Sequence, residues 1–257
     1  DIVIITVGTP LVDAKSKKPN IGILENAINS VMHLINEDNL LILRSTIPVG
    51  LSREISKNIL GSKGIVANIS FCPERTAEGR ALSELRSLPQ IISGINKDSA
   101  DRARIFFEPL VDEIIESSSL EEAELIKLFN NTYRDSVFAI SNTFNKIAQF
   151  YGVDGSTVIN NANLNYPRSS IPKPGFVAGP CLEKDAYILS SRMDEDHLKD
   201  FIKKIRYANE SLEISFADKL LNIIKLNNKM NVLISGIAFK GIPQTNDLRG
   251  SSSIKIL

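Results

Sequence analysis

Cys181 is one of only two cysteines in this 257-residue chain, and it lies in the segment GPCLEKD, between a Gly-Pro pair and a Lys-Asp pair. Most cysteines outside disulfides are small buried hydrophobes, and Cys72, at the end of an apolar stretch, fits that description. Cys181 has a different setting, because Gly179 leaves room for a substrate to approach the backbone and Lys184 is a nearby cation that favours the thiolate. The pattern predicts that Cys181 is a nucleophile, with Asp185 beside it, and that Cys72 is a core residue.

Two pairs of functional side chains stand four residues apart, a spacing that puts both members on one face of a helix. Lys127 and Asn131 lie in a segment with little polar face, so we expect Lys127 to be half-buried and functional, although most helical lysines are solvated surface charges. Glu74 and Glu78 follow a predicted strand. There they could line a site, or they could be solvated acids in the first turn of a helix.

Other polar residues lie beside glycine and proline turns. Thr46, in the segment STIP, is either an ordinary turn residue or a hydroxyl that faces a ligand. Lys240 and Arg249 lie near a strand-to-helix turn in FKGIPQTNDLRGSSS. They are either plain surface cations or a basic pair suited to phosphate.

The composition excludes several classes of function. Lys+Arg and Asp+Glu both number 30, so the formal net charge is zero, and no basic excess attracts nucleic acid or an anionic membrane. No apolar run reaches the roughly 20 residues that span a bilayer, and the first residues lack the basic flank of a signal peptide. With two cysteines and two histidines, we expect no metal site, no disulfide scaffold and a reducing, cytoplasmic location.

Apolar runs alternate with amphipathic segments in the first half of the chain. The apolar runs predict strands at 1–7, 40–46, 65–71, 89–93 and 113–117, the first of them buried on both faces. Helical periodicity predicts helices at 21–36 (capped by Asn20), 51–60 and 98–111. This alternation is typical of a parallel, doubly wound α/β sheet, in which ligands bind at the carboxyl ends of the strands. We therefore expect one crevice to be lined by 7–10, 45–50 and 72–79.

The pattern changes after residue 117. Ser119 and Glu122 form a capping box, and the chain then runs without proline or glycine to residue 151, which predicts one long helix. Asp154 is expected to cap a short helix, a loop follows from 160 to 180, and a second long helix is expected over 194–227. The segment 231–241 reads as another buried strand. The predicted domains are a nucleotide-binding domain at 1–117, a helical domain at 118–227 and the start of another nucleotide-fold domain at 228–257.

Six segments together resemble the UDP-glucose/GDP-mannose dehydrogenase family. In chain order they are VGTP, STIPVG, PERTAEGRAL, AELIKLFNN, GPCLEKD and AFKG…TNDLRGSSS. The resemblance implies an enzyme that oxidises the primary alcohol of a nucleotide sugar to a carboxylate with two molecules of NAD. It also implies an incomplete Rossmann-type sheet, a central all-helical domain that forms a homodimer, and the first strand of a second Rossmann-like domain.

The resemblance also assigns roles to individual residues. Cys181 is similar to the family nucleophile, and Lys127 and Asn131 to the pair that stabilises oxyanions. Asp185 and Glu74 resemble the acid/base groups, and Thr46 the hydroxyl that positions water. The implied NAD contacts are Val7, Gly8, Thr9, Pro10, Ser45, Thr46, Glu78 and Arg249. The implied UDP-sugar contacts are Glu74, Arg75, Lys127, Asn131, Arg168, Gly175, Gly179 and Lys240.

The chain also departs from the family pattern. The glycine fingerprint of the first strand and the acid that binds the adenosine ribose would lie before residue 1, and most of the last domain is absent, so we expect a part of a longer protein. Ala178 stands where the family commonly has an extra glycine, and the segment before Asp247 is slightly long. The motifs lean toward UDP-N-acetylhexosamines such as UDP-N-acetylmannosamine. The alternatives are a UDP-glucose 6-dehydrogenase, a β-hydroxyacid dehydrogenase, which needs no cysteine, and a dimerising module without catalysis.

Overall fold

The computed structural model describes residues 1–64, 68–227 and 231–257. The chain divides into two compact units. The first unit comprises Asp1–Asn130 and Tyr187–Met193. The second comprises Asn131–Ala186 and Asp194–Leu257.

The first unit is built on parallel strands, as predicted. Its three-stranded sheet has the order β1-β2-β3, with the strands β1 (Ile2–Ile5), β2 (Leu40–Leu43) and β3 (Asn68–Phe71). A two-stranded parallel sheet follows, with the strands β4 (Gln90–Ile92) and β5 (Ile114–Glu116). Each predicted strand of this unit is confirmed, although residues 65–67, at the start of the third predicted strand, lie outside the described residues.

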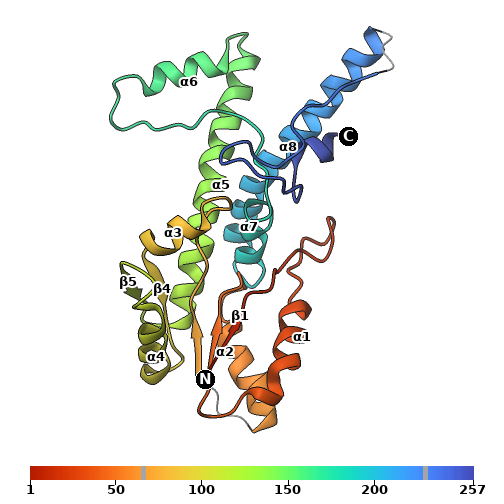
Figure 1. Ribbon diagram of the computed structural model, residues 1–257. Helices are drawn as coiled ribbons and strands as arrows, with labels where there is room; N and C mark the ends of the chain where they lie inside the picture. Colours follow the sequence, from red (N-terminus) through yellow and green to blue (C-terminus); the bar gives the residue numbers. More distant parts are fainter. Residues whose placement is uncertain (65–67, 228–230) are drawn as a thin grey trace. The chain divides into compact units, whose positions relative to one another are not determined.

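Helices cover both faces of the three-stranded sheet (Figure 1). They are α1 (Gly22–Val31, extended by the 3₁₀ turn η1, Met32–Leu34), α2 (Leu51–Glu54, continued by η2, Ile55–Leu60, and η3, Gly61–Lys63) and α4 (Lys97–Phe107). The short helix α3 (Ala81–Ser87) has no buried residue and belongs to neither apolar cluster of the sheet. Leu24 and Ile28 of α1 pack with the side chains of one sheet face. Phe107 of α4 packs with Leu40 and Ile42 on the other face. This arrangement confirms the doubly wound α/β class.

Two local predictions in this unit are wrong. The first strand is buried on one face only, since Ile2 is 38% and Ile4 39% exposed while Ile5 is 5% exposed. The reason is that α1 covers only the face to which Ile5 points. Asn20 does not cap the first helix either. The N-cap is Ile21, which makes no side-chain cap bond.

The helical part of the chain begins with α5, which starts in the first unit and continues in the second. Its helices are α5 (Leu120–Phe150), α6 (Gly155–Asn163), α7 (Leu182–Ser190), α8 (Asp196–Leu226) and α9 (Ser252–Ile256). Ser119 Oγ accepts a hydrogen bond from the Glu122 amide at 3.1 Å, as predicted, but the Glu122 carboxylate accepts from the Ser118 amide at 2.7 Å, one residue earlier than a regular capping box. Asp154 caps α6 by accepting a hydrogen bond from the Thr157 amide at 2.7 Å, as predicted.

The strand predicted at 231–241 does not form. These residues have no strand or helix, and most are exposed; Leu233 is 92% exposed. A strand needs a hydrogen-bonded neighbour, and no described segment of the chain pairs with this one. The domain limits at 117 and 227 stay predictions. In the ranges that the structure describes, no helix is both long and apolar enough to cross a membrane.

Candidate active site

The thiol of Cys181 is exposed and stands at the start of α7. Its carbonyl oxygen accepts hydrogen bonds from the amides of Lys184 at 3.2 Å and Asp185 at 3.0 Å, so the residue caps this helix. Gly179, two residues earlier, has φ +102°, and a Cβ there would lie 2.7 Å from the ring of Phe239. The sharp turn before the cysteine therefore requires glycine.

Asp185 lies one turn into α7 and is completely buried. Its two carboxylate oxygens accept hydrogen bonds from Asn131 Nδ2 at 2.5 Å and from Lys184 Nζ at 2.7 Å. The second unit thus brings together Asp185, Asn131 and the residue that caps α7, Cys181. The Lys184 ammonium, expected to favour the thiolate, forms an ion pair with Asp185.

Cys72 is a core residue, as predicted. It is completely buried and packs with Ile42 and Ile92. Burial raises the pKa of its thiol to about 12. The two cysteines therefore differ as the sequence predicts: one is exposed in a polar loop and the other is sealed in an apolar core.

Glu74, in the first unit, accepts hydrogen bonds at both its backbone carbonyl and its carboxylate. Lys127, half-buried as predicted, donates a hydrogen bond from Nζ to the Glu74 carbonyl oxygen. The Glu74 carboxylate accepts hydrogen bonds from Arg44 Nη2 at 2.5 Å and from the Thr76 amide at 2.8 Å. Burial alone would raise the pKa of Glu74, but the Thr76 amide and the Arg44 guanidinium outweigh it and lower the pKa below its usual value. Glu74 is therefore a carboxylate at neutral pH.

The segments predicted to contact NAD meet at the carboxyl ends of β1 and β2. Thr9 is buried, and its hydroxyl donates a hydrogen bond to the Thr46 carbonyl oxygen. Ser45 is also buried, and its Oγ has no hydrogen-bond partner among the described residues. At Gly8 an added Cβ would meet nothing within 4 Å. A buried hydroxyl without a partner beside open backbone fits a dinucleotide at this edge of a parallel sheet.

Among the remaining predicted NAD contacts, Val7 and Pro10 flank Gly8 and Thr9 in the chain, whereas Glu78 and Arg249 lie elsewhere. Val7 is half-buried and Pro10 exposed. Glu78 is half-buried in the loop before α3, so it is not in the first turn of a helix. Arg249 belongs to the second unit, where its exposed guanidinium pairs with Asp247 at 2.6 Å.

The second unit contains a cavity of about 700 Å³ whose lining includes one of the predicted sugar contacts. Lys240 is in its wall, with Nζ 5.2 Å from the centre of the Phe239 ring. Ala178, the residue in the place of the usual family glycine, also lines this cavity. A cation and an aromatic ring beside open space are groups that can bind a nucleotide.

Three predicted sugar contacts form hydrogen bonds with other residues of the chain. Arg168 is exposed and bonds the Tyr166 hydroxyl at 3.0 Å from Nη2. Arg75 donates to the Pro89 carbonyl oxygen. Gly175 is bound on both sides of its backbone by the Asn142 side chain, with N–H donating at 2.8 Å and C=O accepting at 2.9 Å.

Several residues that bind the predicted site residues or their neighbours in each unit were not predicted from the sequence. Arg44 precedes the STIP segment and binds Glu74, a partner 30 residues away. Asp135 is buried on α5 and bonds Arg206 of α8. The spacing offered one signal: Asp135 follows Asn131 by four residues, so it continues the polar face of the helix.

Comparisons with known proteins agree on one group of enzymes. The family model described as UDP-glucose/GDP-mannose dehydrogenase family, NAD binding domain, matches residues 1–111, and the central domain of the same family matches residues 121–211. The UDP-N-acetyl-D-mannosamine dehydrogenase of Methanocaldococcus jannaschii is 34% identical over 100% of this chain and 58% of its own length.

Two solved structures are also similar. The UDP-D-ManNAc dehydrogenase of Pyrococcus horikoshii has a TM-score of 0.85 and 32% identity, and the match covers 99% of this chain and 61% of that one. The UDP-N-acetyl-mannosamine dehydrogenase of Staphylococcus aureus has a TM-score of 0.86 and 29% identity, and the match covers 100% of this chain and 60% of that one. The chain therefore spans about three fifths of the length of these relatives.

Proposed function

The chain belongs to the UDP-glucose/GDP-mannose dehydrogenase family, and from that membership we propose that the whole protein oxidises the 6-alcohol of a UDP-sugar to a uronate with NAD. The proposed substrate is a UDP-N-acetylhexosamine, with UDP-N-acetylmannosamine first, because the UDP-N-acetylmannosamine dehydrogenases of Methanocaldococcus jannaschii and Pyrococcus horikoshii are 34% and 32% identical to this chain. UDP-glucose is the alternative substrate.

One observation carries the proposal. An exposed thiol at the amide end of α7 lies within one helical turn of a buried carboxylate that is itself hydrogen-bonded by an amide from α5. The amide end of a helix stabilises negative charge, which suits a nucleophile that reacts as an anion. Oxidation of an alcohol to a carboxylate passes through an aldehyde, and a thiol retains that aldehyde covalently.

The chemistry balances with the residues of this chain. NAD, when bound, accepts the hydride in each of two oxidations. Loss of the first hydride and the hydroxyl proton makes an aldehyde, to which Cys181 adds to give a thiohemiacetal. Loss of a second hydride and a proton makes a thioester. Water then cleaves the C–S bond, which releases the carboxylate and restores the thiol.

Other residues support these steps. Asn131 and Lys127 lie one turn apart on α5, about 6 Å along its axis, and both carry N–H donors of the kind that stabilises an oxyanion. Asp185 is the proposed acid/base group. Glu74, kept ionised by Arg44 and Thr76, is the proposed base for hydrolysis of the thioester. Thr9 and Ser45 are proposed to hold NAD with the neighbouring Gly8.

We also propose a homodimer formed through the second unit. Large apolar side chains on its helices are exposed, among them Phe144 (45%), Phe150 (84%), Phe201 (62%) and Tyr207 (64%). Exposed apolar side chains in this number are typical of a protein interface. Both cysteines are free thiols, which fits the proposed cytoplasmic location.

The test uses the full-length protein with NAD and a panel of UDP-sugars. We expect two NADH per sugar consumed and the fastest turnover with a UDP-N-acetylhexosamine. Cys181→Ser should slow turnover by at least a hundredfold, since mutating a catalytic nucleophile removes a transition-state contact. The matched control is Cys72→Ala, which changes a buried thiol outside the proposed chemistry.

The outcomes separate the alternatives. A yield of one NADH per sugar would reject the four-electron reaction. Near-normal turnover of Cys181→Ser would remove the thiol from the mechanism. Faster oxidation of UDP-glucose would overturn the substrate and leave the reaction class intact.

A further inference from the structure

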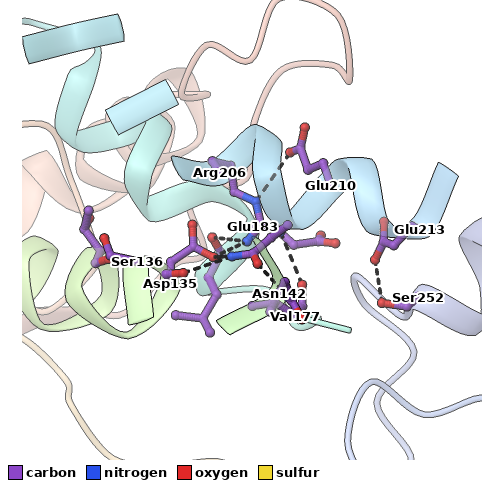
Figure 2. Close-up of polar contacts among 12 residues, drawn as sticks. Asp135, Ser136, Asn142, Val177, Glu183, Arg206, Glu210, Glu213 and Ser252 are labelled. Atoms are coloured by element: carbon purple, nitrogen blue, oxygen red, sulfur yellow. Dashed lines mark hydrogen bonds and ion pairs between the residues drawn. The ribbon is translucent and has the colours of Figure 1, made fainter. Parts of the chain in front are cut away.

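A buried ion pair joins the long helices α5 and α8 inside the second unit (Figure 2). Arg206 Nη1 of α8 lies 2.6 Å from Asp135 Oδ1 of α5, and each side chain is 1% exposed. Asn209, one turn further along α8, donates to the same carboxylate oxygen at 2.8 Å. Arginine and aspartate are rarely buried this completely, because each must give up its hydration.

The remaining hydrogen bonds of this cluster go to the loop that carries Cys181. Arg206 Nη1 also donates to the Leu182 carbonyl oxygen at 3.2 Å, and Nη2 donates to the Val177 carbonyl oxygen at 3.4 Å (Figure 2). These two carbonyls lie on either side of the cysteine in the chain. One guanidinium thus holds both ends of the short segment that presents the thiol.

The same cluster continues toward the start of the loop. Asn142 of α5 donates to Asn209 Oδ1 at 2.9 Å and makes two hydrogen bonds with the Gly175 backbone, at 2.8 and 2.9 Å. Ser141, its neighbour, donates to the Pro172 carbonyl oxygen at 2.5 Å. The loop is therefore bound at four places by side chains of α5 and α8.

This loop has few other means of holding its shape. Residues 171–180 contain no helix or strand, so they have no ladder of backbone hydrogen bonds. Besides the bonds from α5 and α8, the Gly179 amide donates to the Gly250 carbonyl oxygen at 3.1 Å, and the Asn163 side chain bonds both backbone groups of Ile171 at 2.8 and 2.9 Å. The ion pair itself is not arranged for greatest stability. Arg206 Nε and Asp135 Oδ2 are buried without a hydrogen-bond partner among the described residues, although Nε lies 3.7 Å from Glu210 Oε1 as an ion pair (Figure 2). A well-packed apolar pair is often at least as stable as a buried ion pair.

We infer that Arg206, held by Asp135, is a positioning residue that fixes the loop 171–182 and thereby the thiol of Cys181. Displacing a reacting group by about 1 Å can lower the rate roughly a hundredfold. The buried guanidinium therefore affects the rate by keeping the thiol in position. The inference rests on the proposed function for its effect on rate. Its effect on the loop does not depend on that function.

The experiment replaces the ion pair with apolar groups of similar size in the full-length protein, as Asp135→Leu together with Arg206→Met. Hydrogen exchange of the backbone amides of 175–182 is followed by mass spectrometry, and kcat and KM are measured with the sugar. We expect the variant to fold with a lower thermal midpoint, because the Val177 and Leu182 carbonyls and Asn209 lose a partner. We expect exchange of the loop amides at least tenfold faster, and kcat lowered at least tenfold with KM changed less than threefold.

Lys146→Met is the matched control. Lys146 of α5 bonds Ser211 of α8 at 3.1 Å, so this variant breaks a polar link between the same two helices without touching a loop carbonyl. We expect its loop exchange and its kcat to stay within twofold of the wild type. If the double variant does not fold, Arg206→Lys replaces it, since lysine keeps a cation beside Asp135 but has one nitrogen where arginine uses two to reach the Val177 and Leu182 carbonyls. Faster exchange at 177–182 is then expected, and wild-type exchange overturns the inference.

The outcomes decide between positioning and mere stability. A folded variant with wild-type loop exchange overturns the inference, whatever its rate. Faster exchange with an unchanged kcat also overturns it, because the thiol would then not need the clamp. If the wild-type protein oxidises no UDP-sugar, the proposed function fails, while the exchange measurement still tests whether the guanidinium holds the loop.

Discussion

The two cysteines of this chain should differ by more than a thousandfold in reactivity, and alkylation of the native protein measures the difference. The perturbation is iodoacetamide at about pH 8, added in excess to the folded full-length protein. Only the thiolate reacts with this reagent. Cys181 is exposed at the start of α7, whereas Cys72 is completely buried behind β2 and α4.

The magnitude follows from the buried thiol. With the pKa of Cys72 raised to about 12 by burial, roughly one thiol in 10⁴ is ionised at pH 8. An ordinary thiol, with a pKa of about 8.5, is roughly one quarter ionised at the same pH. Cys72 should therefore react about a thousandfold more slowly than an ordinary thiol, before exclusion of the reagent from the core is counted.

Intact-mass spectrometry with peptide mapping gives the rates. Within residues 1–257 we expect one label within minutes, on the peptide of Cys181, and none on Cys72 until the protein is unfolded in denaturant. The Cys181→Ser variant should lose the fast label. Fast labelling of the Cys72 peptide would refute the burial of this thiol and with it the contrast on which the proposed nucleophile depends.

Three further changes test contacts in either unit. Arg44→Met should raise the pKa of Glu74 toward its ordinary value. A carboxyl whose pKa is lowered in the native state stabilises the protein at pH values above its unfolded pKa, and this stability is lost as the pH falls through the native pKa. Urea midpoints between about pH 5 and pH 2 should therefore fall less steeply in the variant than in the wild type, and an unchanged profile would contradict the pairing. Gly179→Ala should destabilise the protein by roughly 1–3 kcal/mol in thermal unfolding, since φ is +102° and the methyl would lie 2.7 Å from a phenylalanine ring; Gly175→Ala, which has open space for the methyl, is the control. The Glu124 carboxylate accepts a hydrogen bond from the buried Ser52 amide at 3.0 Å. Glu124→Ala should lower the free energy of unfolding by about 1–3 kcal/mol, because this amide would lose its partner. A urea midpoint within error of the wild type would count against this bond.

The secondary structure of most of the chain could be predicted because its signals are local. Runs of branched apolar residues mark β2 and β3, and the absence of proline and glycine marks α5 over almost its observed length. The different settings of Cys181 and Cys72 could also be predicted, because the first has glycine and charged neighbours and the second has apolar ones. The six family motifs carried the rest of the interpretation.

Partners far apart in the chain were decided only by the tertiary structure. Arg44 meets Glu74 across 30 residues and Arg206 meets Asp135 across 71, and neither pairing leaves a periodic trace in the sequence. The strand predicted at 231–241 is absent for a related reason. A helix makes its hydrogen bonds within its own segment, so its sequence can specify it, whereas a strand or a buried ion pair exists only where another part of the chain supplies the partner.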